Sequence, residues 1–181
     1  MRAFETEKTE VAEIDRSVYD IKDKVNAAFE VNSGLTTEIV EQISKEKHDP
    51  DWMREFRLKA LDIYNKASIP NWGPSLEGLD MRNIVTYVRP NTEMRGKWSE
   101  VPDDIKNTFE RLGIPQAERS SLAGVGAQYD SEVVYHNVKE EVAAQGVVYT
   151  DMESALTGPY ADMVKEHFMK CVPPTVHKFA A

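Results

Sequence analysis

The chain contains one cysteine, Cys171, among its 181 residues. A lone thiol cannot form an internal disulfide or supply a site of several thiolates, so it favours a protein of the reducing cytoplasm. The sequence also has no apolar run of about 18 residues, which a membrane-spanning helix requires. Its first residues, MRAFETEKTE, contain no apolar stretch typical of a secretory signal. We therefore expect a cytoplasmic protein with no membrane association.

Basic residues are also fewer than acidic ones. Lys and Arg total 22 against 31 Asp and Glu, which gives a formal net charge of −9 at pH 7. Nucleic acids and anionic lipid surfaces attract clustered Lys and Arg, so the acidic balance argues against both as partners. The composition, 41% hydrophobic and 29% charged, is near the globular average. The length allows one domain, or one domain with a tail.

Catalytic motifs are missing as well. The sequence has no G-x-x-x-x-G-K-[ST] loop, and Gly124-Val125-Gly126 lacks the third glycine of a dinucleotide-binding fingerprint. Ser121 does not lie in a G-x-S-x-G elbow, so a triad with Asp130 and His136 would need these residues to converge in the fold. The adjacent pairs Asp103-Asp104 and Glu140-Glu141 point apart on a helix. We predict no catalytic residues and no enzyme.

His167, Cys171 and His177 are the potential metal ligands with suggestive spacing. On one helix, His167 and Cys171 would share a face, since they are four residues apart. Zinc and iron–sulfur sites usually need three or four ligands, and Cys171 is the single thiolate here. We predict no metal-binding and no cofactor-binding residues in this chain.

The distribution of apolar residues divides the chain into three parts. Residues 1–33 mix charges of both signs with few large apolar side chains, so we expect a flexible arm. Residues 34–171 carry the helix and strand patterns of a domain. Residues 172–181, which begin Val-Pro-Pro, are expected to be extended.

Two helices are predicted at the start of this domain. Thr36 can cap the first, which carries an apolar stripe and ends near Lys45–His48. Asp49 is predicted to cap the second, with Pro50 at its first position. The second helix has apolar residues every four positions, at Trp52, Phe56, Ala60 and Tyr64, a pattern more typical of a core than of a ligand site.

The rest of the domain alternates short elements. Strands are expected at 84–88, 132–136 and 147–149, where β-branched and aromatic residues gather. Helices are expected from Asp103, at 115–122, at 138–144 and after Gly158-Pro159, and Gly124 and Gly126 are expected to end the helix at 115–122. Thr150 and Glu153 have the spacing of a capping box. The fold class predicted is α+β, mainly α, with a few short strands.

Four ordered segments resemble the N-terminal region of the SufB family, scaffold subunits of the SUF iron–sulfur cluster assembly system. They are GLTTEIVEQISKEKHDPDWMREFRLKALDIY (34–64), TFERLGIPQAERSSLAGVGAQYDS (108–131), QGVVYTDMESAL (145–156) and VPPTVHKFAA (172–181). The resemblance covers the chain from Gly34 onward, so residues 34–171 are interpreted as a SufB-like N-terminal domain.

The resemblance implies more than this chain contains. In the family, the Val-Pro-Pro segment leads into a parallel β-helix, so the chain is expected to be a truncated fragment that lacks this core. Full-length members are implied to build an iron–sulfur cluster with SufC and SufD, using sulfur from a donor protein. The residues credited with that chemistry lie in the missing part, and Cys171 is given no ligand role.

Two functions follow from these expectations. The first is a structural, partner-contacting part of a SufB-like scaffold, without cluster chemistry of its own. The alternative is a stand-alone helical module that binds other SUF components through the apolar face of residues 52–64.

Overall fold

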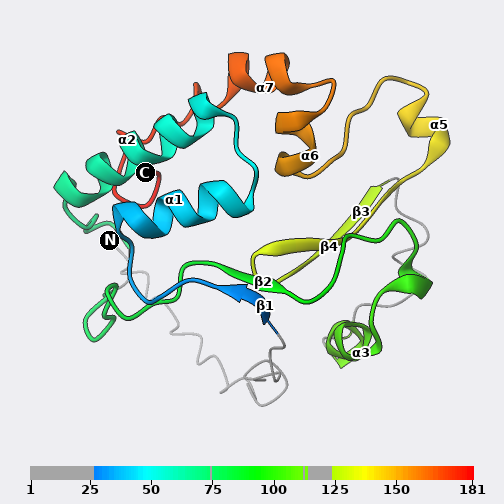
Figure 1. The fold of residues 1–181 in the computed structure, drawn as a ribbon, viewed down its shortest axis with the longest axis horizontal. Coiled ribbons are helices and arrows are strands. Elements are labelled where there is room, and N and C mark those ends of the chain that lie inside the picture. Colours follow the sequence, from blue (N-terminus) through cyan, green and yellow to red (C-terminus); the bar gives the residue numbers. More distant parts are fainter. Residues whose placement is uncertain (1–26, 74, 112, 114–123) are drawn as a thin grey trace, which may run out of the picture.

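The computed structural model describes residues 27–73, 75–111, 113 and 124–181 (Figure 1). Helices account for more of these residues than strands do, and both sheets are two-stranded and antiparallel. The α+β class is therefore confirmed. The expectation that a parallel β-helix core is missing stays a prediction, as do the domain boundaries. Within the described ranges, no helix is both long enough and apolar enough to cross a bilayer.

The first sheet pairs β1 (Ala27–Glu30) with β2 (Val88–Pro90). Strand β1 lies inside residues 1–33, the range expected to be a flexible arm. The strand expected at 84–88 is shifted toward the C-terminus, because β1 pairs with Val88, Arg89 and Pro90. Val85 makes just an isolated bridge to Ser33.

Helices α1 (Thr37–Glu46) and α2 (Asp51–Lys66) follow the sequence pattern closely. Thr36 caps α1 as predicted, since its side chain accepts a hydrogen bond from the Ile39 N–H at 3.3 Å. Asp49 does not cap α2; Pro50 holds the N-cap position without a side-chain hydrogen bond. The apolar stripe of α1 packs on the first sheet through a cluster of Val31, Ile39 and Tyr87.

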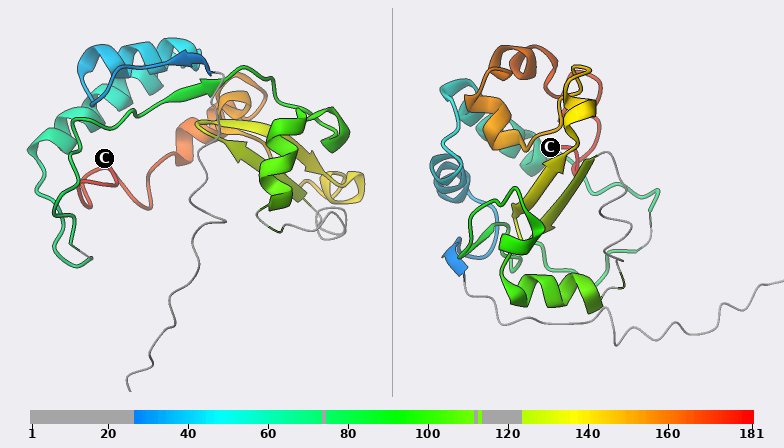
Figure 2. Two further views of the ribbon diagram at one scale, coloured as in Figure 1. Left: turned by 90° about the horizontal axis from the view of Figure 1, so that it is seen from below. Right: turned by 90° about the vertical axis from the view of Figure 1, so that its right-hand side faces the viewer.

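A second unit is the hairpin of β3 (Gly124–Tyr129) and β4 (Glu132–Val138), with the 3-10 turn η1 (Trp98–Glu100) and α3 (Asp103–Arg111). Its core contains Val101, Ile105, Ala127, Val134 and Tyr135, with Trp98 and Phe109 packed against it. The two further views show β3 and β4 between α3 and the C-terminal helices (Figure 2).

Gly124 and Gly126, which were expected to end the helix at 115–122, both lie in β3. Their small size has a packing role: a Cβ on Gly126 would lie 2.7 Å from the Tyr149 hydroxyl. Tyr149 lies over the hairpin through its side chain, and residues 147–149 do not form the expected strand. The helix expected at 115–122 lies outside the described residues.

Within the described residues, three more short helices follow: α5 (Glu140–Ala143), α6 (Met152–Thr157) and α7 (Ala161–His167). The expectation that residues 172–181 are extended is wrong, because two turns close there through Val176 N–H to Pro173 C=O and Ala180 N–H to His177 C=O. The turns bring the end of the chain beside α2, where the Lys178 ammonium donates to the Tyr64 carbonyl at 2.5 Å.

Candidate functional site

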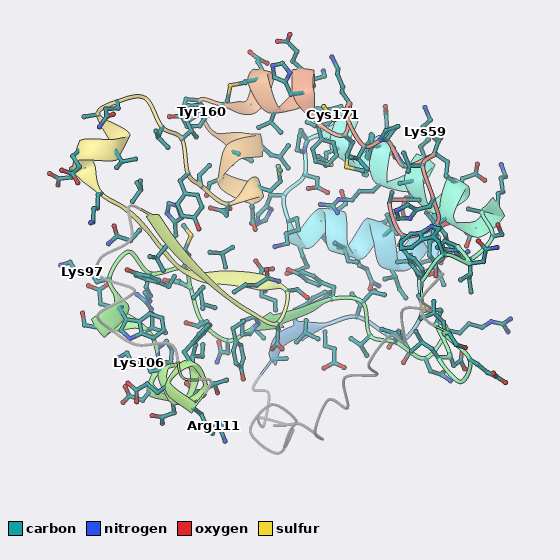
Figure 3. All side chains as sticks on the ribbon, turned by 180° about the vertical axis from the view of Figure 1, so that it is seen from behind. Lys59, Lys97, Lys106, Arg111, Tyr160 and Cys171 are labelled. Atoms are coloured by element: carbon teal, nitrogen blue, oxygen red, sulfur yellow. The ribbon has the colours of Figure 1, made fainter. Side chains whose placement is uncertain are left out.

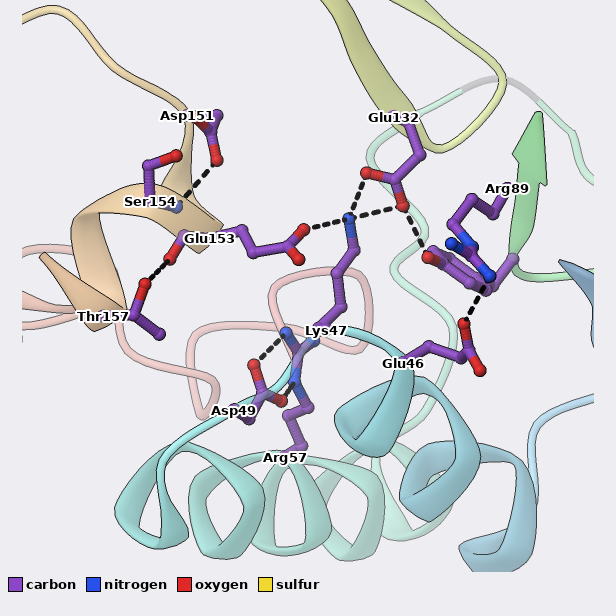
Figure 4. A network of polar contacts seen from close by, with 11 residues as sticks. Glu46, Lys47, Asp49, Arg57, Arg89, Glu132, Asp151, Glu153, Ser154 and Thr157 are labelled. Carbon is purple, nitrogen blue, oxygen red and sulfur yellow. Dashed lines mark hydrogen bonds and ion pairs between the residues drawn. The ribbon is translucent and has the colours of Figure 1, made fainter. Parts of the chain in front are cut away.

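A polar cavity of about 580 Å³ lies where α1 meets α2, β2, the β3–β4 turn and α6. Its walls carry both signs of charge, from Lys47, Arg57 and Arg89 and from several carboxylates (Figure 4). These elements are far apart in the sequence, so only the folded chain assembles the site.

Lys47 is the central cation of this cavity because of the way α1 ends. It is the C-cap residue of α1, and its N–H bonds back to the Ile43 and Lys45 carbonyls. His48 then takes a left-handed backbone conformation with φ 52°, which ends the helix. A cation is favourable at this position, because the unpaired carbonyls of a helix C-terminus carry partial negative charge.

The Lys47 ammonium lies 2.6 Å from both carboxylate oxygens of Glu132 and 3.4 Å from Glu153. The Lys47 and Glu132 side chains are only 19% and 17% exposed. Tyr87 donates its hydroxyl hydrogen to the same Glu132 carboxylate at 2.5 Å. One lysine therefore joins the end of α1 to β4 and α6, and β2 reaches the same carboxylate through Tyr87.

Burial of Tyr87 is the main cause that raises the pKa of its hydroxyl well above the usual value. The hydrogen bond to Glu132 and the negative charge of that carboxylate raise the pKa further. Tyr87 therefore stays a neutral donor at physiological pH, which suits it to hold the Glu132 carboxylate.

Two more ion pairs border the cavity. Arg57 on α2 donates to Asp49 at 2.6 and 3.3 Å, and the Asp49 side chain is fully covered. Arg89 on β2 pairs with Glu46 at 3.1 Å. This explains why Asp49 is not the helix cap: its carboxylate is turned toward an arginine two turns along α2, and an ion-assisted hydrogen bond is stronger than a neutral one.

The capping box expected at Thr150 and Glu153 is wrong by one residue. Asp151 caps α6, since its carboxylate accepts from the Ser154 N–H at 2.8 Å, and Glu153 reaches Lys47 instead. Burial alone would raise the pKa of Asp151, but hydrogen bonds from Ser154 outweigh it and the pKa is lowered.

The potential metal ligands do not come together as a site. Helix α7 ends at His167, so Cys171 is not on the same helix, and its thiol is exposed after the helix (Figure 3). His177 packs its ring against Trp72 at 5.7 Å between centroids. In the described ranges, no group of three or more His, Cys, Asp or Glu residues could hold a metal ion. These residues do not fit an iron–sulfur cluster.

Of the hypothetical triad, Asp130 and His136 do not converge. Ser121 lies outside the described residues. Asp130 is in the β3–β4 turn, whereas His136 pairs with Gly126 farther along the hairpin. At about 3.4 Å per residue, the four steps from Glu132 to His136 span about 14 Å, so His136 and Asp130 lie at opposite ends.

The aromatic face of α2, which the sequence analysis considered as a docking surface, is covered within the chain. Phe168 lies edge-on to Trp52 and Phe56, with ring centroids 6.0 and 5.1 Å away. The Lys178 ammonium lies 3.9 Å from the centroid of the Tyr64 ring. The core interpretation of this face is therefore the better one.

Sequence reasoning missed every partner of Lys47. Glu132 and Glu153 follow it by 85 and 106 residues. No spacing rule connects such positions. The one local signal was a lysine at the end of a predicted helix, which indicates a favourable charge but not its partner.

Comparison with known proteins shows which proteins the chain is similar to. No protein-family model matches the sequence. No solved structure matches it. Curated proteins do match, and they are named as iron–sulfur cluster assembly proteins.

The resemblance to the SufB family is thereby confirmed. The chain is 49% identical over 163 residues to the iron-sulfur cluster assembly protein SufB of Bacillus subtilis, which covers 90% of this chain and 35% of that protein. It is 45% identical over 163 residues to an iron-sulfur cluster assembly SufBD family protein of Staphylococcus haemolyticus, with the same shares covered. A SufBD family protein of Mycobacterium tuberculosis is 42% identical over 177 residues, 97% of this chain and 21% of that protein. The chain thus spans about a third or less of these relatives.

Proposed function

We propose that this chain is a structural, partner-contacting region of a SufB-like scaffold for iron–sulfur cluster assembly. The observation that carries the proposal is the 49% identity to SufB of Bacillus subtilis across 90% of the chain. At this identity the two sequences share a fold, and the role of the relative in cluster assembly becomes the best guide to the role of this chain.

A structural role suits the side chains that are present. Cluster binding depends on cysteine thiolates, and Cys171 is the single cysteine in the sequence. Lys47, Arg57 and Arg89 in the polar cavity pair with carboxylates, and these pairs stabilise the fold. We therefore expect neither a resident cluster nor enzymatic activity in this polypeptide.

Partner contact would use the apolar surface that the fold leaves open. Trp72 is 73% exposed in the loop after α2, and Val176 and Phe179 beside it in the C-terminal turns are 58% and 46% exposed. Exposed aromatic and aliphatic groups in one region are typical of protein interaction sites. SufC, SufD and a sulfur-donor protein are the partners that the family resemblance suggests.

Copurification tests this proposal. The tagged chain would be coexpressed separately with SufC, SufD and a sulfur-donor protein, and we expect at least one to be retained. The Trp72→Ala variant should lose that partner, whereas Lys66→Ala, an exposed change on α2, should keep it. Retention of none of the three would contradict a partner-contacting role.

The second part of the proposal needs a separate experiment. Anaerobic reconstitution with iron and sulfide should leave the purified chain without a stable visible absorbance. A cluster that survives desalting on the wild-type chain and is absent from Cys171→Ser would contradict the proposal that the chain holds no cluster.

The alternative, a stand-alone module that binds SUF components, loses its original surface because Phe168 and Lys178 cover the face of residues 52–64. It now rests on the Trp72 surface instead. Binding to a SUF component with an affinity that is unchanged when the rest of a SufB scaffold is supplied would favour this alternative.

A further inference from the structure

The described residues contain two hydrophobic clusters that share no member. The helical body consists of β1, β2, α1 and α2; its cluster contains Val31, Ile39 and Tyr87, and α2 packs against α1. The hairpin body consists of η1, α3, β3 and β4 around Val101, Ile105 and Val134. Figure 3 shows the same separation, with Lys59 of α2 at one end and Lys106 and Arg111 of α3 at the other.

Polar contacts join these two bodies. Lys47 and Tyr87 from the helical body meet the Glu132 carboxylate from the hairpin body. Beside them, Ser131 and Val88 exchange two hydrogen bonds, Ser131 N–H to the Val88 carbonyl at 3.1 Å and Val88 N–H to the Ser131 hydroxyl at 3.0 Å. We call these four contacts the polar joint. The cavity of about 580 Å³ lies along it.

Such a joint differs from a core in how it responds to opening. Apolar surface that is exposed always costs free energy, whereas separated polar groups regain hydrogen bonds to water. The net stabilisation from the joint is therefore small compared with that of either cluster. Regions held mainly by polar contacts open at lower free energies than packed cores.

We infer that the polar joint opens as a unit while the helical and hairpin bodies stay folded, and that Lys47 sets how often this happens. Lys47 also contacts α6, through Glu153. Its loss leaves the Glu132 carboxylate, which is 17% exposed, without its cation in the closed state. Water solvates that carboxylate in the open state, so the loss of Lys47 lowers the free energy of opening.

Hydrogen exchange measured by mass spectrometry or NMR on the full chain tests the inference. The Val88 and Ser131 amides report the joint, because their hydrogen bonds cross it. In Lys47→Met we expect these two amides to exchange at least about tenfold faster, while amides in the centre of α2 and in β4 at Val134 change less than about twofold. Lys66→Met, which removes an exposed ion pair with Asp62, should alter none of them.

Two results would overturn the inference. Equal acceleration at all amides would show one cooperative unit, and unchanged exchange at Val88 and Ser131 would show that Lys47 does not hold the joint. If Lys47→Met fails to fold, the unmodified chain still decides. At low urea concentrations, the exchange rates of the joint amides should depend little on urea, whereas those of the core amides should depend strongly on it. The same urea dependence in both groups would overturn the inference.

Discussion

Lys47 and Glu132 are 85 residues apart in the sequence, and the lysine ammonium lies 2.6 Å from both oxygens of the glutamate. The pair fixes the end of α1 against the start of β4. Because both side chains are less than one-fifth exposed, water screens the attraction less than at an open surface. The removal of either charge leaves the other partly buried and unpaired.

Glu132→Gln should lower the free energy of unfolding by about 1–2 kcal/mol, since the amide can still accept from Tyr87 but no longer neutralises Lys47. Urea denaturation followed by circular dichroism measures this. The matched control is Asp62→Asn, which removes the exposed ion pair of Asp62 with Lys66 and should cost less than about 0.5 kcal/mol. Equal losses of unfolding free energy in the two variants would show that partial burial does not strengthen the Lys47–Glu132 ion pair.

Tyr87 should make the chain less stable at high pH. Its pKa is raised in the folded state, so its contribution is fully present below the unfolded value of about 10 and is lost as pH rises toward the folded value. The difference in unfolding free energy between the wild-type chain and Tyr87→Phe should therefore shrink between pH 9 and pH 11. Comparison with the variant removes the effect of other tyrosines and lysines. A constant difference over this range would contradict the prediction.

Asp151→Ala should destabilise the chain by about 1 kcal/mol, because the N-cap acceptor of α6 is lost. Thr150→Ala is the control and should have little effect. The pKa of Asp151 is lowered on folding, so the stabilisation is present above the unfolded value of about 4 and disappears as pH falls. Thermal unfolding at pH 7 and pH 3 would measure both effects. A larger loss from Thr150→Ala would restore the capping box predicted from the sequence.

Gly158→Ala should cost about 1–3 kcal/mol. A Cβ at Gly158 would lie 2.7 Å from the Ser154 carbonyl oxygen, a backbone atom that cannot move without disturbing the end of α6. Gly96→Ala is the control, since nothing lies within 4 Å of its Cβ position. Chemical denaturation of both variants compares them. Similar stabilities would mean that the α6–α7 connection adjusts freely.

Lys178→Met should loosen the last turn of α2, because Lys178 donates to the Tyr64 and Ala67 carbonyls. We expect about 1 kcal/mol of lost protection at amides near Ile63 and Ala67, measured by hydrogen exchange. Lys170→Met changes an exposed lysine nearby and should leave this protection intact. Unchanged exchange in Lys178→Met would show that the C-terminal turns do not stabilise α2.

Elements with strong local signals were predictable. The stripe after Thr36 gives α1, the four-residue spacing from Trp52 to Tyr64 gives α2, and the acidic start at Asp103 gives α3. These patterns predict helices because the hydrogen bonds of a helix join residues that are close in the sequence. The apolar period and the capping residues can therefore be recognised in a short segment. Strand β3 was not predictable in the same way, because its two glycines have a low strand propensity. Its pairing with β4 and its packing against Tyr149 stabilise the strand instead.

Composition, helical period and ordered motifs were enough to predict the α+β class, the main helices and the resemblance to SufB proteins from the sequence. Tertiary structure alone decided that Lys47, Tyr87, Glu132 and Glu153 form one network and that Asp49 pairs with Arg57. It also decided that the potential ligands near Cys171 do not converge. The physical reason is that a charge at the surface of an isolated element has many possible partners. Only the packing of distant elements selects one.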